Sequence, residues 1–289
     1  MNLLNAPIWK ASVTVAKERA GDVAALFEIT PPTPQAVLID EEPFGRSATV
    51  EALYAQMPDG DLLSRVAELP IHVGLIPDQD WIRLSQEGLP PVRAGRFFVH
   101  GAHDKGAVPS GVIPLRIEAG LAFGTGHHES TALCLALLTD IAKRRCVWRA
   151  LDLGCGTGVL AIGMARLWKR RVVAADIDPI AVAVARENAT LNDTGPLVRT
   201  HVADGVPNAT RGRRFDLIAA NILAGPLTRL APQIARALGP RGMLILSGIL
   251  RWQENLVLGF YRPHGLVLRE RRRDGNWSAL LLERPERAG

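Results

Sequence analysis

The amino-acid sequence predicts an α/β protein in which a doubly wound, mostly parallel sheet ends in an antiparallel hairpin and is preceded by a small α+β domain. Three observations predict this fold. Strand and helix patterns alternate regularly from residue 150 to residue 260, and Asp274-Gly275-Asn276 then joins two further strand patterns through a tight turn. Before them, residues 8–76 follow the order β-α-β-β-α-β, which is that of the ferredoxin-like arrangement.

These patterns predict a ferredoxin-like domain over residues 1–77, a linker over 78–95 and a larger domain over 96–289. Residues 78–87 have the pattern of a short capped helix that a Pro-Pro pair then stops. In the small domain we expect strands at 8–15, 36–39, 48–54 and 71–76, and helices at 17–27 and 61–69.

The larger domain shows two strand patterns around a glycine-rich loop before the regular alternation begins. Its predicted strands are 96–100, 113–117, the stretch that begins at 150, 172–176, 197–202, 215–220, 243–246, 266–271 and 277–282. Its predicted helices are 131–143, the one from the glycine turn to 168, 179–192, 226–238 and 250–260.

The composition excludes several classes of protein. With 289 residues, 47% of them hydrophobic, the chain can fill a globular core, and its apolar runs fall short of the roughly 20 residues that span a bilayer. The three cysteines lack metal-ligand spacing, and the N-terminal residues lack the pattern of a signal peptide. We therefore expect a cytoplasmic protein without a metal site, a disulfide framework or a membrane contact.

A basic run near the C-terminus contrasts with the modest net charge of +5. It consists of Arg269, Arg271, Arg272 and Arg273. Such a run is either a solvated strand edge or a contact with the backbone of a nucleic acid, and the sequence favours the solvated edge.

The stretch Ala-Leu-Asp-Leu-Gly-Cys-Gly-Thr-Gly, residues 150–158, is predicted to be a buried strand, a glycine turn and the start of a helix. Its three glycines can take dihedrals closed to other residues and leave no Cβ between the main chain and a ligand. The GxGxxG fingerprint of dinucleotide-binding proteins would require a third glycine at Val159. The GxGxG form after Asp152 is instead the one that holds S-adenosylmethionine, the predicted cofactor.

Polar residues stand where three neighbouring strands end. Asp176 lies 22 residues after Gly154, where a carboxylate can accept both ribose hydroxyls, and Asp178 suits the lesser role of helix cap. Asp204 follows the third strand and is either a contact of the adenine edge or a simple turn residue. Asn221 ends the fourth strand, and this position at the carboxyl end of a central strand favours a place in the site over a helix cap.

The second unusual segment is Phe123-Gly124-Thr125-Gly126-His127-His128, which packs two glycines, a hydroxyl and two imidazoles into six residues. Adjacent histidines on a loop favour packing or capping over proton transfer. The sequence offers no obvious general base.

The chain resembles the bacterial PrmA family, the methyltransferases that modify large-subunit ribosomal protein L11. The resemblance is strong over residues 96–289 and is limited to length and element order before them. The segments that carry it are Gly-Leu-Ala-Phe-Gly-Thr-Gly at 120–126 with Thr131, the glycine turn, Asp-Ile-Asp-Pro at 176–179 and Asn-Ile-Leu-Ala-Gly-Pro-Leu at 221–227. One departure is that the usual Thr-His-Pro after Gly-Thr-Gly is here His127-His128-Glu129.

The resemblance implies an S-adenosylmethionine-dependent protein N-methyltransferase that modifies lysine ε-amines and the N-terminal α-amine of ribosomal protein L11, free or on the large ribosomal subunit. It also implies that the small domain grips the protein substrate, and we expect a monomer. Carried over by position, the family's cofactor contacts fall on Thr131, Gly154, Asp176 and Asn221. The predicted contacts further include Gly156 in the glycine turn, Phe123 in the upstream loop and Asp204, and Asn221 is the predicted catalytic residue because its carbonyl oxygen can orient the incoming amine.

Other functions fit parts of the sequence. One is methylation of a lysine on another protein or of ribosomal RNA, with the basic run as a weak RNA contact. Against a planar acceptor, Ile222 and Leu223 stand where enzymes acting on adenine or glutamine amides usually carry Pro-Pro and an aromatic residue. The remaining alternatives are a nicotinamide-dependent oxidoreductase and a ribosome-associated binder without turnover.

Overall fold

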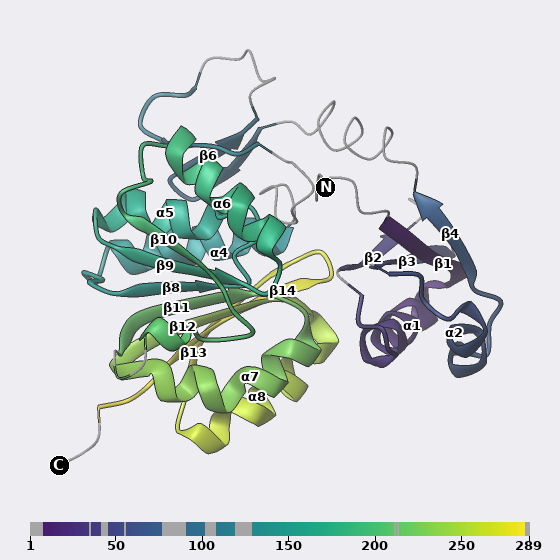
Figure 1. The fold of residues 1–289 in the computed structure, drawn as a ribbon. Helices are drawn as coiled ribbons and strands as arrows, with labels where there is room; N and C mark the ends of the chain where they lie inside the picture. Colours follow the sequence, from purple (N-terminus) through teal and green to yellow (C-terminus); the bar gives the residue numbers. More distant parts are fainter. Residues whose placement is uncertain are drawn as a thin grey trace. The chain divides into compact units, whose positions relative to one another are not determined.

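The computed structural model describes residues 8–34, 36–41, 46–54, 56–76, 91–101, 108–118, 129–210, 212 and 214–286 (Figure 1). The chain divides into two compact units, residues 1–84 and 85–289. Most of the predicted linker, including its helix, lies outside the described residues, so that helix stays a prediction.

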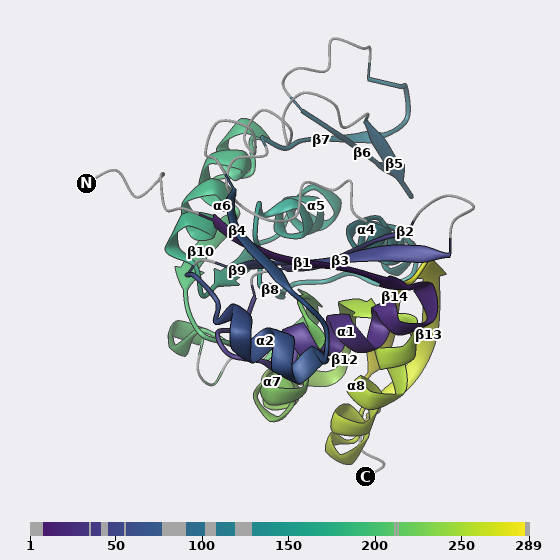
Figure 2. The same cartoon turned by 90° about the vertical axis from the view of Figure 1, so that its right-hand side faces the viewer.

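The smaller unit has the predicted β-α-β-β-α-β order. Its elements are β1 (Ile8–Ala16), α1 (Lys17–Ile29), β2 (Ala36–Glu41), β3 (Ser47–Tyr54), α2 (Gly60–Ala67) and β4 (His72–Ile76). The strands pair antiparallel in the order β2-β3-β1-β4. Side chains alternate along β1, so that Val13 and Val15 are buried with Phe27 of α1 and Leu63 of α2, and both helices cover the same face of the sheet (Figure 2).

The larger unit is built on a seven-stranded sheet of the order β10-β9-β8-β11-β12-β14-β13. The strands are β8 (Ala150–Leu153), β9 (Val172–Asp176), β10 (Val198–Val202), β11 (Phe215–Asn221), β12 (Leu238–Leu250), β13 (Val267–Asp274) and β14 (Trp277–Glu283). The first five are parallel, and β14 and β13 form the predicted antiparallel hairpin. The predicted doubly wound sheet is confirmed.

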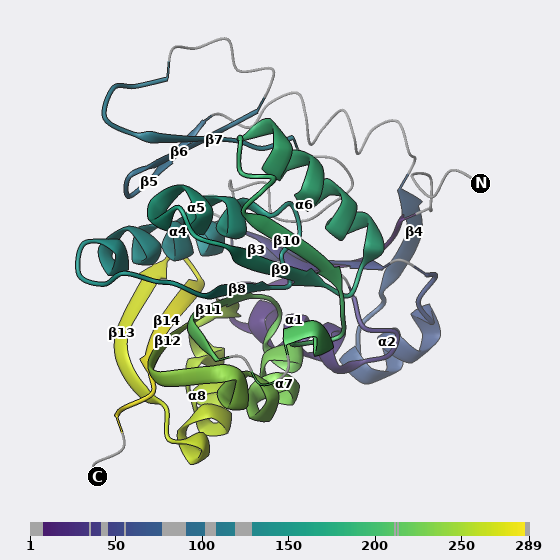
Figure 3. The same ribbon diagram turned by 60° about the vertical axis from the view of Figure 1, so that its left-hand side comes forward.

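Helices cover both faces of this sheet (Figure 1, Figure 3). They are α4 (Glu129–Ala142), α5 (Val159–Trp168), α6 (Pro179–Leu191), α7 (Ala224–Ala237) and α8 (Glu254–Tyr261), with 3-10 turns at Asn208–Thr210, Arg251–Gln253 and Arg262–His264. Because side chains alternate along β11, Leu217 and Ala219 pack into the core under α4, α5 and α6, while Ile218 and Ala220 pack into the core under α7 and α8.

A separate three-stranded sheet precedes α4 in the chain. It consists of β5 (Val92–Ala94), β6 (Phe97–His100) and β7 (Ile113–Arg116), with β5 antiparallel and β7 parallel to β6. β5 falls within the range predicted to be linker. Phe97 of β6 is fully buried in the same core as α4 and α5, which attaches this sheet to the larger unit.

The largest differences from the predicted boundaries are at β12 and at the helix that follows it. β12 was expected at 243–246 but extends from Leu238 to Leu250, because it pairs with β11 at its start and with Trp277 of β14 at its end. The last predicted helix therefore begins later, at Glu254, after a 3-10 turn. Pairing partners that lie far away in the chain decide both ends of the strand.

A bulge near the end of β12 brings its backbone against the end of β11. The register with β14 shifts between Leu246 and Ile249, and Gly248 within this shift has φ +77°. A Cβ at Gly248 would lie 2.7 Å from the carbonyl oxygen of Ile222 and 2.8 Å from its nitrogen. Only glycine leaves room for the two backbones at this distance.

We expect Gly248→Ala to destabilise the larger unit by about 3 kcal/mol. The cost of a left-handed conformation at a non-glycine residue adds to the cost of a clash with backbone atoms. That corresponds to a fall of roughly 5 to 10 °C in the melting temperature, measured by circular dichroism. Gly259→Ala is the matched control, since Gly259 lies in α8 with open space where its Cβ would be, and should leave the melting temperature unchanged or slightly raised. Equal melting temperatures for wild type and Gly248→Ala would contradict this account.

Candidate active site

The site follows from the order of the parallel strands. From β8 the chain moves outward to β9 and β10 on one side and then to β11 and β12 on the other, so the strand order reverses between β8 and β11. Open α/β sheets bind ligands in the crevice at the carboxyl ends of such strands. Leu153 of β8 pairs with Ala220 of β11, so the glycine turn and Asn221 follow side by side at this edge.

The glycine turn is held close to both of its neighbours. Gly154 and Cys155 donate their backbone N–H groups to the carbonyl oxygen of Ala175 at 2.8 and 3.0 Å. A Cβ at Gly154, whose φ is +70°, would overlap Cγ2 of Ile222, so the conformation and the packing both require glycine here. After the turn, α5 begins at Val159 with its first N–H groups directed at the same edge.

Asp152 supports the turn from beneath. Its side chain is buried, and Oδ2 accepts a hydrogen bond from the N–H of Ala161 in the first turn of α5 at 2.8 Å. Burial raises the pKa of Asp152 to about 8 against the lowering effect of that hydrogen bond. Asp152 therefore ties β8 to the first turn of α5 and supports the glycine turn.

Asp176, at the end of β9, is placed at the crevice next to the glycine turn. Its Oδ2 accepts from the N–H of Gly156 at 2.9 Å and its Oδ1 from the N–H of Asp178 at 3.1 Å. Burial raises its pKa, and these hydrogen bonds oppose the rise. Asp178 caps α6 through the N–H of Ile180 at 2.8 Å, so the predicted capping role of Asp178 is confirmed.

The structure brings Asn221 and Thr131 together from positions 90 residues apart. Asn221 Nδ2 donates to Thr131 Oγ1 at 3.1 Å, and the threonine is buried. A second contact, from Ser247 Oγ of β12 to the carbonyl oxygen of Ser130, anchors the start of α4 beside it. Asn221 Oδ1 is buried and has no hydrogen-bond partner among the described residues.

The other predicted site residues are placed differently. Asp204 is half exposed, and its carboxylate forms a bidentate ion pair with Arg229 of α7 at 2.8 and 3.0 Å, which lowers the pKa of Asp204. Its role at the adenine edge stays a prediction. Phe123, His127 and His128 lie outside the described residues.

Two asparagines of α6 were not predicted to matter for the site. Asn188 is buried and joins the carbonyl oxygen of Thr157 in the glycine turn to the backbone N–H of Glu118, at 3.0 Å each. Asn192, one turn later, bonds both the N–H and the carbonyl oxygen of Arg116 at 2.9 and 2.6 Å. Both fix the segment that leads into the Phe123 loop, and their spacing of four along a helix otherwise rich in alanine is the signal in the sequence.

These residues fit S-adenosylmethionine. The turn has no Cβ at Gly154 that would keep a ligand from the backbone, Asp176 offers a carboxylate for hydroxyl groups, and Asn221 keeps a buried acceptor oxygen. The reversal of strand order, the GxGxG turn and an acid at the next strand tip define the S-adenosylmethionine-dependent methyltransferases with a Rossmann-like sheet. The predicted cofactor, S-adenosylmethionine, is the one that this class of protein uses.

The chain belongs to the family described as ribosomal protein L11 methyltransferase (PrmA), whose model matches residues 11–285. A ribosomal protein L11 methyltransferase of Mesorhizobium japonicum is 50% identical over 215 residues, which are 74% of this chain and 73% of that protein. The corresponding protein of Brucella suis is 49% identical over 210 residues, 72% of this chain and 74% of the relative. The family predicted from the sequence is confirmed, and with it the methyltransferase class in place of an oxidoreductase.

A solved structure agrees with this placement. The crystal structure of ribosomal protein L11 methylase from Lactobacillus delbrueckii subsp. bulgaricus matches with a TM-score of 0.61 at 29% identity and covers 68% of this chain and 99% of that one. In the part of the chain that the structure describes, no helix is long and apolar enough to cross a membrane. Nor do the described residues hold a group of three or more metal-ligating side chains.

We expect Asp176→Ala to raise the dissociation constant of S-adenosylmethionine about ten-fold or more, because charge-assisted hydrogen bonds contribute roughly 1.5 to 3 kcal/mol each. Isothermal titration calorimetry measures it. Asp178→Ala is the matched control, since it removes only the helix cap, costs stability of about 1 kcal/mol and keeps the affinity within about two-fold. Unchanged affinity of Asp176→Ala would show that this carboxylate only holds the turn.

Proposed function

We propose that this protein transfers methyl groups from S-adenosylmethionine to amino groups of ribosomal protein L11, namely lysine ε-amines and the N-terminal α-amine. The relatives at about 50% identity are named for that substrate. The observation that carries the proposal is the buried Oδ1 of Asn221 next to the glycine turn, which has no hydrogen-bond partner among the described residues. An acceptor oxygen at this place suits an amine N–H. We further propose a monomeric, cytoplasmic enzyme.

The acceptor must lose a proton before it can be methylated. A lysine with the ordinary pKa of about 10.4 costs roughly 4 to 5 kcal/mol to deprotonate at neutral pH, and desolvation in the crevice offsets part of that cost. Asn221 orients the neutral amine and takes no proton, so the proton leaves to solvent. When bound, the cofactor supplies an electrophilic methyl group, and positioning of the amine is the main task of the protein.

The neighbours of Asn221 support an aliphatic amine as the acceptor. Ile222, which follows it, lies against the glycine turn and leaves no flat platform for a base or a planar amide. The carboxylates of the crevice have other tasks, Asp152 beneath the turn and Asp176 at the ribose position, so neither takes the proton of the amine.

Mass spectrometry of ribosomal protein L11 after incubation with enzyme and S-adenosylmethionine tests the proposal, since one spectrum reports the modified amines and the number of methyl groups. We expect methylation at lysine side chains and the N-terminus, and a turnover at saturating cofactor that is about 100-fold lower for Asn221→Ala. A cofactor affinity measured on the same variant separates lost binding from lost positioning. Unmodified L11 alongside methylation of another protein or of RNA would overturn the substrate assignment, and no methyl transfer at all would favour the non-catalytic binder.

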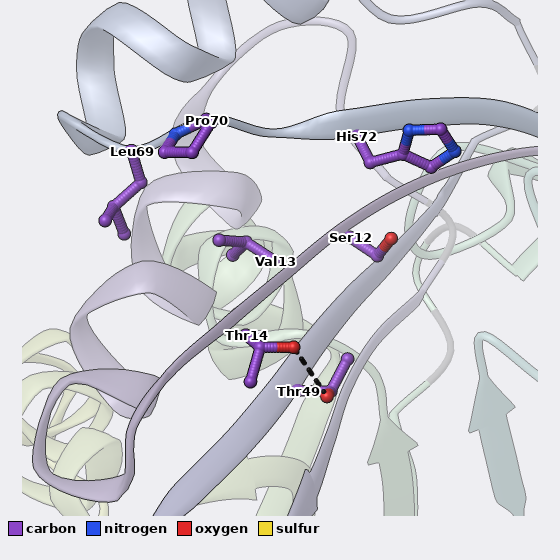
Figure 4. A pocket seen from close by; sticks show the side chains of 7 residues that line it. All are labelled: Ser12, Val13, Thr14, Thr49, Leu69, Pro70 and His72. Carbon is purple, nitrogen blue, oxygen red and sulfur yellow. Dashed lines mark hydrogen bonds between the residues drawn. The ribbon is translucent and has the colours of Figure 1, made fainter.

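We propose in addition that the smaller unit recognises the protein substrate. The smaller unit carries a hollow of about 480 Å³ along β1, β3 and the segment that joins α2 to β4 (Figure 4). It is lined by Ser12, Val13, Thr14, Thr49, Leu69, Pro70 and His72. The hydroxyl oxygens of Thr14 and Thr49 lie 3.2 Å apart, so polar side chains form part of the lining of this hollow. A segment of the substrate would find hydrogen-bonding groups and apolar walls there.

Thr14→Arg should therefore raise KM for ribosomal protein L11 about five-fold or more with kcat unchanged, because it fills the hollow and removes binding that does not depend on the reacting atoms. Val66→Arg is the matched control. Val66 is exposed on α2, on the helix layer, and the change adds the same side chain away from the hollow. Equal KM values for Thr14→Arg and wild type would contradict recognition through this hollow.

A further inference from the structure

The amino ends of the parallel strands carry a cluster of cations on the edge of the sheet opposite the active site. This is the end at which β14 leaves the sheet toward the C-terminus (Figure 1). We call the group the amino-end cluster; its members are Lys143, Arg144, Trp148, Arg149, Lys169, Arg170, Arg171 and Arg214, and all of them are exposed.

The sheet register brings these residues together from three chain segments. Ala150 of β8 pairs with Val172 of β9 and with Leu217 of β11, so the residues that precede each strand start side by side at spacings of about 4.8 Å. Side-chain contacts tie the segments further. The guanidinium of Arg170 lies 4.0 Å from the ring centre of Trp148, and Asp216 Oδ2 accepts the backbone N–H groups of Trp148 and Arg149.

Carboxylates neutralise only part of the charge of this cluster, since Asp140 pairs with Lys143 and Asp216 lies against the backbone of Trp148 and Arg149. Within the described residues, Arg144, Arg149, Lys169 and Arg171 form no ion pair, although Lys143 pairs with Asp140. Four cations that remain unpaired on one edge attract a polyanion.

The arginines of the basic run in β13, by contrast, are paired with carboxylates. Arg269 pairs with Glu283 at 2.9 Å, Arg273 with the buried Glu254 at 2.7 Å, and Arg272 with Asp140 and Glu270. Arg271 also lies 3.5 Å from Glu254. The sequence favours a solvated strand edge for this run. β13 is the edge strand of the sheet, and its arginines form ion pairs with carboxylates of the protein there.

Trp148 gives the cluster a second property. Its side chain is 61% exposed although it is large and apolar, and it stands among arginines. An exposed aromatic ring beside cations is the arrangement that binds single-stranded nucleic acid, in which a base stacks on the ring and phosphates contact the cations. Arginine is the preferred partner of phosphate because its planar group makes two parallel hydrogen bonds.

We propose that the amino-end cluster binds a single-stranded segment of RNA, with phosphates on Arg149, Lys169 and Arg171 and a base against Trp148. The choice of RNA over DNA rests on the proposed ribosomal substrate, while the binding surface stands on the residues themselves. The surface lies across the sheet from the crevice, so RNA and cofactor bind to opposite edges.

Fluorescence anisotropy with a labelled oligouridylate of about 15 nucleotides tests the proposal on the full chain without any methyl-transfer step. Affinity should fall as salt rises, with a log–log slope of about −0.7 for each phosphate contacted. Arg149→Glu with Arg171→Glu should raise the dissociation constant about ten-fold or more and flatten the slope by about 1.4. The neutral pair Arg149→Gln with Arg171→Gln should show a smaller change in the same direction, with melting temperatures equal to that of the wild type.

The matched control is Arg251→Glu with Arg262→Glu, two exposed arginines of the same unit that form no ion pair within the described residues. It should leave the dissociation constant within about two-fold, since Arg251 follows β12 and Arg262 follows α8, whereas the cluster precedes β8, β9 and β11. Trp148→Ala should weaken binding about five-fold, and unchanged binding would remove the stacked base from the proposal.

Several outcomes would overturn the RNA surface. They are an affinity that does not change with salt concentration, or an equal loss of affinity in the control variant. Tighter binding of a DNA oligonucleotide of the same sequence, or binding only to vesicles with anionic headgroups, would also overturn it. Because the readout is binding, these outcomes are independent of whether ribosomal protein L11 is methylated.

Discussion

The active site depends on the packing of Ile222 between two glycines. A Cβ at Gly154 would overlap the side chain of Ile222, and a Cβ at Gly248 would meet its backbone. The turn after β8, the end of β11 and the bulge of β12 are therefore locked together around one residue. Because Asn221 immediately precedes Ile222, the same packing fixes where the carboxamide points, and its bond to Thr131 then fixes the start of α4.

Two carboxylates, one on the buried Asp152 and one on the half-buried Asp176, complete this arrangement. Asp176 accepts the N–H of Gly156, and Asp152 accepts the N–H of Ala161, so the glycine turn is held at both of its ends before any ligand arrives. A turn that is already ordered adds little ordering cost to binding. Burial raises the pKa of Asp152, so the charged form of this carboxyl is disfavoured in the core beneath the turn.

The sequence predicts those parts of the fold and the site that depend on local pattern. The alternation of strands and helices predicts the parallel sheet, and carboxyl ends that meet at one edge predict the neighbourhood of Asp176 and Asn221. The length of β12 depends on its pairing with β14, some thirty residues further on. No local sequence pattern therefore predicts that length. The contact of Asn221 with Thr131 joins positions 90 residues apart, so the carboxamide–hydroxyl bond follows only from the folded chain.

The two edges of the sheet differ in charge. Because they are separated, the cations at one edge and the candidate cofactor site at the other can coexist. Asp176 and Asn221 mark the carboxyl edge, whereas the amino edge carries arginines and Lys169 that form no ion pair among the described residues. β9 and β11 have 5 and 7 residues, so the two edges lie about 16 to 23 Å apart at roughly 3.3 Å per residue. At physiological ionic strength the Debye length is about 8 Å, so the field of the cations is largely screened at the crevice. A polyanion held at one edge would therefore raise the local concentration of a bound substrate without disturbing the residues proposed to hold the cofactor at the other edge.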